Sequence, residues 1–242
     1  MADRGPSSLF GKLAPSGRVS DFYWRFQNQE HQVVMSFEQV SVDFSDGIPG
    51  VQHLTGDVVL DGNRFSGHIY AANSSLDFDK HFLQPIPFKE ISSNFDGRWT
   101  HDFFTFNAFD ILFDSDALNL SADVGLTIPT DGEVSMSLLA NIHRGDAEQA
   151  ALFYPHLLMG QDLVNYLNDA IIAGQLSQGQ VLFNGPFSAF PFNEHQGIFI
   201  VNAELEDAKF SFDSEWPAIS NFAANSNFTN NSMLITAREG RL

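Results

Sequence analysis

An unbroken alternation of apolar and polar residues runs from Leu118 to Ile128. Side chains of a β-strand point alternately to opposite faces, so this period of two predicts a strand with one dry face and one wet face. The dry positions are Leu118, Leu120, Ala122, Val124, Leu126 and Ile128. What covers this dry face is the question that the pattern raises for the whole chain.

Other stretches repeat the same two-residue period and are predicted as strands separated by turns. They cover residues 19–26, 33–44, 56–62, 67–71, 91–129, 134–142, 180–184, 198–205, 208–212 and 227–236. The turn Asp61-Gly62-Asn63 lies between two alternating runs and predicts a hairpin. A mainly β chain follows from the number of such stretches.

At two places the apolar residues switch from one set of alternate positions to the other, which we call a parity switch. One lies near Ala108, and the other lies at Glu206-Asp207. A single extra residue in a strand reverses which side chains face inward, so both places predict a β-bulge. Strongly curled sheets use bulges and glycines at their corners, and this chain contains both.

Two helices interrupt the strands in the second half of the chain. Asp146 followed by Gln149 resembles a capping box, which predicts a short helix over residues 147–154 that ends at Pro155. Apolar residues with helical spacing predict a second helix over residues 161–173, with Gly174 placed to end it. We expect these helices to cover one end or edge of the sheet.

Composition excludes several classes of function. The 242 residues carry a formal net charge of -18, which opposes binding to nucleic acid. The chain has no cysteine, so it has neither disulfides nor thiolate chemistry. It contains 25 phenylalanines, an unusually heavy use of one large apolar side chain, which indicates a folded protein.

The common enzyme motifs are missing, and the eight histidines are scattered singly, without the short pairings typical of metal sites. Two carboxylate pairs remain, Asp114 with Asp116 and Asp77 with Asp79. Either pair could bind Ca²⁺ or serve as the acid and base of a glycosidase, but a solvated acidic face is the simpler interpretation. We therefore predict no enzyme, no metal and no cofactor.

One set of motifs resembles a known family. These motifs are Ile48-Pro-Gly50, Tyr154-Pro155, Tyr166-Leu167, Gly185, Phe190-Pro191-Phe192, Gly197-x-Phe199 and Trp216-Pro217-Ala218-Ile219. In this order they resemble the YhdP family of AsmA-like bacterial envelope proteins. The succession from Phe190 to Trp216 is the most specific part.

The resemblance implies a long, strongly curled antiparallel sheet that forms a U-shaped hydrophobic groove, with one or two short helices inserted. Residues 1–9 would be a flexible start, and residues 10–242 would form a single β-groove segment of a longer AsmA-like protein. The segment would belong to the periplasmic portion of a protein anchored in the inner membrane of a double-membraned bacterium.

The implied function is a non-enzymatic conduit that carries phospholipid between the inner and outer membranes and supports outer-membrane integrity. The implied partners are phospholipid acyl chains and components of both membranes. The expected groove lining is Leu118, Leu120, Ala122, Val124, Leu126, Ile128, Phe199, Val201, Ala203, Leu205, Ile69 and Ala71. A closed β-sandwich acting as a scaffold or interaction domain of the cell envelope is the alternative, because packing sheet on sheet produces the same alternation.

Overall fold

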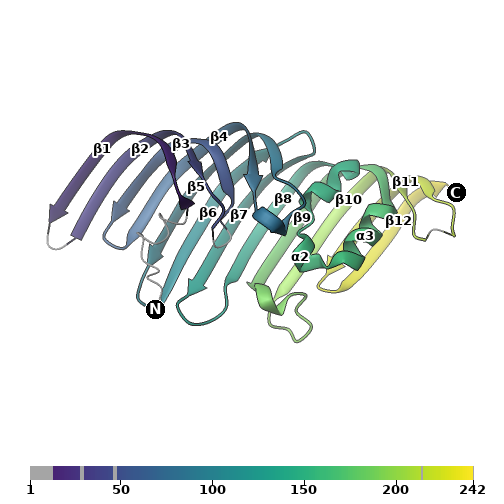
Figure 1. The fold of residues 1–242 in the computed structure, drawn as a ribbon. Helices are drawn as coiled ribbons and strands as arrows, with labels where there is room; N and C mark the ends of the chain where they lie inside the picture. Colours follow the sequence, from purple (N-terminus) through teal and green to yellow (C-terminus); the bar gives the residue numbers. More distant parts are fainter. Residues whose placement is uncertain (1–12, 28–29, 46–47, 214, 242) are drawn as a thin grey trace.

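A computed structural model describes residues 13–27, 30–45, 48–213 and 215–241 of the chain. In these residues twelve strands form one antiparallel sheet, in which strands that follow one another in sequence lie side by side (Figure 1). The strands are β1 (Ser16–Gln27), β2 (Glu30–Val42), β3 (Gly50–Asp61), β4 (Arg64–Asp77), β5 (Ile86–Trp99), β6 (Phe103–Asp114), β7 (Leu118–Pro129), β8 (Ser135–Asp146), β9 (Ile171–Pro186), β10 (Ile198–Phe210), β11 (Ile219–Thr229) and β12 (Ser232–Arg241). The prediction of a mainly β, antiparallel protein is confirmed.

The sheet has an apolar face and a polar face, because residues that pair across antiparallel strands share a face. Leu120 of β7 pairs with Phe113 of β6 and with Ile142 of β8. Thr127, on the other side of β7, pairs with polar residues of both neighbouring strands. β7 covers the alternating stretch that opened the sequence, so the prediction of a two-faced strand there is confirmed.

Both predicted parity switches are confirmed as bulges. In β6 the pairing slips between Ala108 and Ile111, and Asp110 has a φ of 52°. In β10 the pairing slips after Glu206, and Asp207 has a φ of 49°. The same positive φ occurs within other strands at Asp21, Gln39, His53, Asn73 and Asn221. Asn and Asp enter this left-handed region more readily than most residues, which explains why polar residues stand at these bends.

The expected strong curl is wrong. The twelve strands form a single open layer with β1 and β12 at its two edges, and the bulges bend strands without rolling the sheet into a U-shaped groove (Figure 1). The expected U-shaped groove is therefore not shown by the described residues. In the part of the chain that the structure describes there is also no second sheet, which the closed β-sandwich requires.

The helical insertion between β8 and β9 differs in detail from the prediction. The insertion contains η2 (Ala147–Phe153), α2 (His156–Met159) and α3 (Gln161–Ala170). Two isolated 3₁₀ turns lie elsewhere, η1 (Asp79–His81) between β4 and β5 and η3 (Phe187–Ala189) between β9 and β10. The Asp146 side chain accepts hydrogen bonds from the backbone N–H of Glu148 and from the Gln149 amide, both at 3.0 Å, so Asp146 caps a 3₁₀ helix. The expected flexible start, residues 1–9, lies outside the described residues.

The second predicted helix is too long at its C-terminal end. α3 ends at Ala170, and Ile171 begins β9 by pairing with Phe210 of β10. Gly174 lies inside β9 with a φ of 143°, where a Cβ atom would come within 2.9 Å of the Ala208 backbone. Pairing with Phe210, 39 residues away in sequence, therefore overrides the local helical pattern at Ile171.

The predicted strand over residues 227–236 is instead a hairpin. β11 ends at Thr229 and β12 begins at Ser232, with Thr229 and Ser232 paired. Asn230, in the turn between them, has a φ of 53°. The turn chemistry of consecutive asparagines decides this break, which the apolar pattern alone did not indicate.

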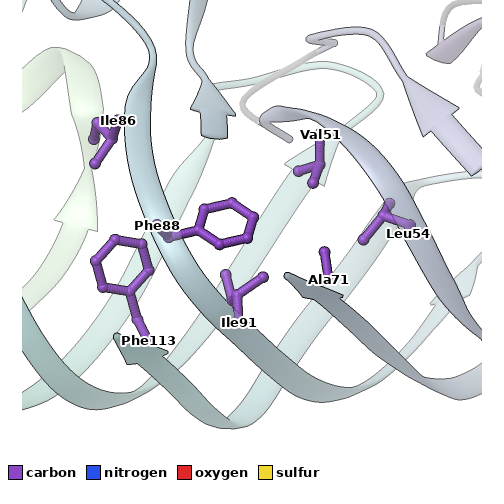
Figure 2. Packing of buried hydrophobic residues seen from close by; sticks show 7 residues of the cluster. All are labelled: Val51, Leu54, Ala71, Ile86, Phe88, Ile91 and Phe113. Atoms are coloured by element: carbon purple, nitrogen blue, oxygen red, sulfur yellow. The ribbon is translucent and has the colours of Figure 1, made fainter. Parts of the chain in front are cut away.

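The main buried cluster gathers around the bends of β3 to β6. It consists of Val51, Leu54, Ala71, Ile86, Phe88, Ile91 and Phe113 (Figure 2). Phe153 of η2 packs against it. A second buried cluster joins α3 to β10 and β11 through Ala170, Ala208, Phe210, Phe222 and Ala224. Bent strands and inserted helices thus supply the core that a second sheet supplies in a sandwich.

We predict that Phe88→Ala lowers the free energy of unfolding by about 3–5 kcal/mol, as measured by urea denaturation. The Phe88 side chain is 4% exposed, and its ring lies 6.0 Å from the ring of Phe113. The matched control is Phe22→Ala, because Phe22 is 64% exposed on β1 and its loss should change stability by about 0.5 kcal/mol or less. Equal losses in the two variants would contradict this assignment of the core.

Candidate functional site

The twelve predicted lining residues all lie on the apolar face, on β4, β7 and β10. Strand pairing joins them into rows that cross the sheet. One row joins Ala71, Leu120 and Ala203 through their partners on the strands between them, namely Ile91, Phe113, Ile142 and Gly179. Residues more than 130 positions apart in sequence therefore lie on one apolar row.

Parallel rows contain most of the remaining predicted positions. Val124 is linked to Phe199 through Leu138 and Phe183. The row from Ala122 to Val201 runs through Ala140 and Val181, and the row from Leu118 to Leu205 runs through Gly145 and Leu176. The structure thus brings the predicted residues together on one surface, while their role in binding a ligand stays a prediction.

The apolar face is only partly covered. Of the twelve residues, Ala71, Leu126 and Ala203 are buried, and the other nine are half-buried. The buried cluster and the helices occupy the bent region, whereas among the described residues the buried clusters do not extend to the hairpin at Gly62. An apolar face left in this state is suited to contact with another apolar body.

Five aromatic rings form a cluster on this face that was not among the predicted lining residues. They come from β4, β5 and β6 and are Phe65, Phe95, Trp99, Phe104 and Phe106. The Phe65 ring lies 5.8 Å from that of Phe104 and 6.2 Å from that of Trp99. Phe95 and Trp99 stand at alternate positions of one strand, which places both side chains on the same face. This spacing is the signal in the sequence that could have found the cluster.

Glycines on neighbouring strands make room for these rings. A Cβ atom at Gly97 would lie 2.3 Å from the Phe65 ring, and one at Gly67 would lie 2.7 Å from the Phe95 ring. Phe37 covers Gly56 of β3 in the same way at 3.0 Å. Glycine in a strand commonly marks such a close approach, so these residues shape the apolar face rather than bend the chain.

A second aromatic cluster explains the most specific motif of the sequence. Phe192 is 1% exposed, and its ring packs against Phe183 and Phe190 with centroids 5.2 and 5.9 Å away. A Cβ atom at Gly185 or Gly197 would lie 2.7 or 2.5 Å from this ring. The Phe-Pro-Phe and Gly-x-Phe motifs are therefore parts of one interlocked cluster at the turn between β9 and β10.

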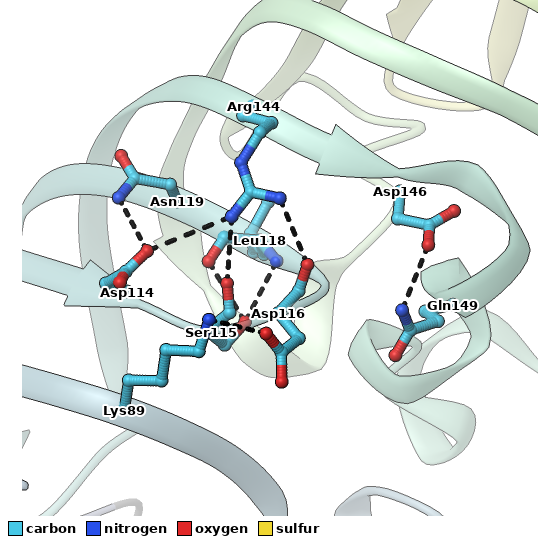
Figure 3. Close-up of polar contacts among 9 residues, drawn as sticks. All are labelled: Lys89, Asp114, Ser115, Asp116, Leu118, Asn119, Arg144, Asp146 and Gln149. Atoms are coloured by element: carbon cyan, nitrogen blue, oxygen red, sulfur yellow. Dashed lines mark hydrogen bonds and ion pairs between the residues drawn. The ribbon is translucent and has the colours of Figure 1, made fainter. Parts of the chain in front are cut away.

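The carboxylates of Asp114 and Asp116 are each engaged with a different cation (Figure 3). Asp116 lies 2.5 Å from the Lys89 ammonium, and Asp114 lies 3.9 Å from the Arg144 guanidinium. Arg144 also donates hydrogen bonds to the backbone carbonyls of Ser115 and Asp116, at 3.0 and 3.2 Å. This network holds the turn before β7, so the pair is a structural feature and does not fit a glycosidase acid and base.

The other carboxylate pair has a local role as well. The Asp77 side chain accepts a hydrogen bond of 2.8 Å from the backbone N–H of Asp79 and so shapes the turn into η1. Among the described residues no group of three or more His, Asp or Glu side chains could hold a metal ion. Neither pair therefore supports the Ca²⁺ alternative.

We predict that Gly197→Ala destabilises the protein by about 1–3 kcal/mol, because its Cβ would overlap the Phe192 ring and lie 2.6 Å from the Asn184 carbonyl oxygen. Thermal or urea unfolding measures the loss. Gly125→Ala is the control, since its Cβ would meet the movable ends of Ser137 and Asn107. A loss at position 125 as large as that at position 197 would refute the interlocked cluster.

The Lys89 ammonium, by its hydrogen bond and its charge, holds the pKa of Asp116 below its ordinary value of 3.8. Because the folded-state pKa is lowered, the ion pair is formed at neutral pH and is lost as the pH falls through that lowered value. We predict that Lys89→Ala raises the pKa of Asp116 in a carboxyl NMR titration. Lys80→Ala should leave it unchanged, and an unchanged value in Lys89→Ala would contradict the ion pair.

Comparison with known proteins agrees with the motifs. The Escherichia coli (strain K12) protein named "Intermembrane phospholipid transporter YhdP" is 27% identical over 188 residues, which are 77% of this chain and 15% of that protein. No solved structure matches the chain. In the described residues no helix has the length and apolar character to span a membrane. The model of the family described as "YhdP protein" matches residues 3–242, and the chain therefore belongs to the YhdP family.

Proposed function

We propose that this chain is a non-enzymatic lipid-transfer segment, in which the apolar face of the sheet holds phospholipid acyl chains. The observation that carries the proposal is the set of apolar rows that cross the sheet, in which nine of the twelve predicted lining residues are only half-buried. A closed domain would bury these rows under a second layer. Acyl chains would remove the same surface from water, at about 25 cal/mol per Å².

The dimensions of the sheet support this function. Twelve strands have eleven spacings, so at about 4.8 Å each the sheet extends about 53 Å across its strands. The apolar rows traced from β4 to β10 cover six of these spacings, about 29 Å, which is close to the roughly 30 Å hydrocarbon thickness of a bilayer. The apolar rows run in this direction, across the strands, so a lipid could move from strand to strand without leaving an apolar surface.

The polar chemistry of the segment supports a passive role. Movement along an apolar wall needs no nucleophile and no acid and base, and the carboxylate pairs are engaged within the protein. The polar face keeps the other side of the sheet in water. Headgroups would then lie at the border where the apolar face meets solvent.

We propose that residues 10–242 of this chain form one segment of a longer protein. The name of the Escherichia coli relative supports a wider role for that longer protein. We propose that this protein is anchored in the inner membrane and that this segment lies in the periplasm. There it would form part of a bridge-like conduit between the inner and outer membranes and support outer-membrane integrity. Its partners would be phospholipid and components of both membranes.

Mass spectrometry of the gently purified chain tests the proposal. We expect co-purified phospholipid, and we expect Leu120→Asp and Val201→Asp to reduce it by about tenfold or more. Each change puts a carboxylate on the apolar face. Burying this unpaired charge under acyl chains would cost several kcal/mol, which is enough to reduce the bound phospholipid tenfold or more.

Thr127→Asp is the matched control, because Thr127 lies on the polar face of the same strand as Leu120 and is exposed. Circular dichroism and thermal unfolding identify any variant that has lost its fold. The proposal would be wrong if the unmodified chain contained no phospholipid, or if folded Leu120→Asp and Val201→Asp contained as much phospholipid as the unmodified chain.

A further inference from the structure

The polar face over β8 to β11 carries a regular array of side-chain amides. One row contains an amide on each of four adjacent strands, through the pairing of Asn141, Gln180, Asn202 and Asn227. The next row, two residues along the strands, pairs Gln178 with Glu204 and Glu204 with Asn225. We call the six amide residues the amide array.

The amide array lines a shallow depression of about 700 Å³. Its floor is the sheet itself, and it extends to Leu234 and Thr236 on β12. Glu204 is the only carboxylate in the lining, and no Lys or Arg contributes to it among the described residues. In a chain with a net charge of -18, this part of the surface is therefore unusually neutral.

Much of the hydrogen-bonding capacity of the array is free. Gln180 donates to the Asn141 carbonyl oxygen at 3.0 Å, and Asn227 donates to that of Asn202 at 2.5 Å. Within the residues that the structure describes, the side chains of Gln178 and Asn225 make no hydrogen bond, and the amide groups of Asn141 and Asn202 donate none. Each amide offers two donors and one acceptor, so donors and acceptors are interspersed over the depression.

The lining excludes several classes of ligand. An anion would meet no Lys or Arg and would face Glu204, and a metal ion would find only one carboxylate and one imidazole, that of His143. An added β-strand could pair at the outer edge of β12 but not over the array, because β8 to β11 are paired on both sides. The ligand that fits is neutral and carries hydroxyl groups that both donate and accept.

We propose that the amide array binds a neutral glycan chain, which lies across the strands on the face opposite the apolar rows. Neighbouring strands are about 4.8 Å apart, which is close to the length of one sugar ring in an extended glycan. Each strand can therefore present an amide to successive sugars. The lining has no Phe, Tyr or Trp ring on which sugars could stack, so we expect weak binding that strengthens as the glycan spans more strands.

NMR titration of the ¹⁵N-labelled chain tests this inference. The probes are the extended β-1,4-linked hexamer of N-acetylglucosamine, its monomer, and the curved α-1,4-linked hexamer of glucose. We expect the side-chain amide signals of the array to shift with the β-1,4 hexamer, and we expect this hexamer to bind at least tenfold more tightly than either other probe.

The double variant Gln180→Leu with Asn202→Leu should weaken binding of the β-1,4 hexamer at least tenfold. Asn184→Leu is the matched control, because Asn184 lies on the same face of β9 outside the depression, and it should bind as the unmodified chain does. Absence of binding, equal affinity for monomer and hexamer, or full binding by the folded double variant would overturn the inference. Phospholipid content should not change in the double variant, which separates this test from that of the lipid-transfer proposal.

Discussion

Burial of an apolar face without a second sheet is the constraint on which this structure depends. A sheet with one apolar side must cover that side, and sandwiches do so with a second sheet. Here the described residues form one layer of twelve strands. Cover comes from the bent region of the strands and from a helical insertion, so Phe88 and Phe192 are buried while most of the apolar residues of β7 stay half-buried.

The bulges make this partial cover possible. Asp110 and Asp207 take positive φ values where the pairing slips, and each bulge changes which residues face the apolar side. The main cluster lies around these bends, and α3 packs through Ala170 where β10 and β11 bend. The buried clusters are thereby concentrated at the bends and the helical insertion, and much of the remaining apolar surface is half-buried.

The two faces of the sheet carry separate chemistry. On the apolar face, glycines such as Gly97 and Gly197 let aromatic rings lie against the neighbouring backbone. On the polar face and at the turns, carboxylates are held by cations, as Asp116 is by Lys89, or by backbone N–H groups. Lipid transfer would use the side chains of the apolar rows, and glycan contact would use the amide side chains that alternate with them along the strands.

The sequence by itself determined the two faces, because alternation is a local property: residues 118–128 and the parity switches near Ala108 and Asp207 predicted a strand and two bulges that the structure contains. Tertiary structure decided what local pattern cannot specify. Ile171 leaves the helix because it pairs with Phe210, and Asp116 loses the role of a possible acid because Lys89 lies beside it. The shape of the sheet was decided in the same way, since curl depends on the summed twist and bending of twelve paired strands. Each of these outcomes depends on contacts between residues far apart in sequence, which is the physical reason that the alternation predicted the faces but not the curl.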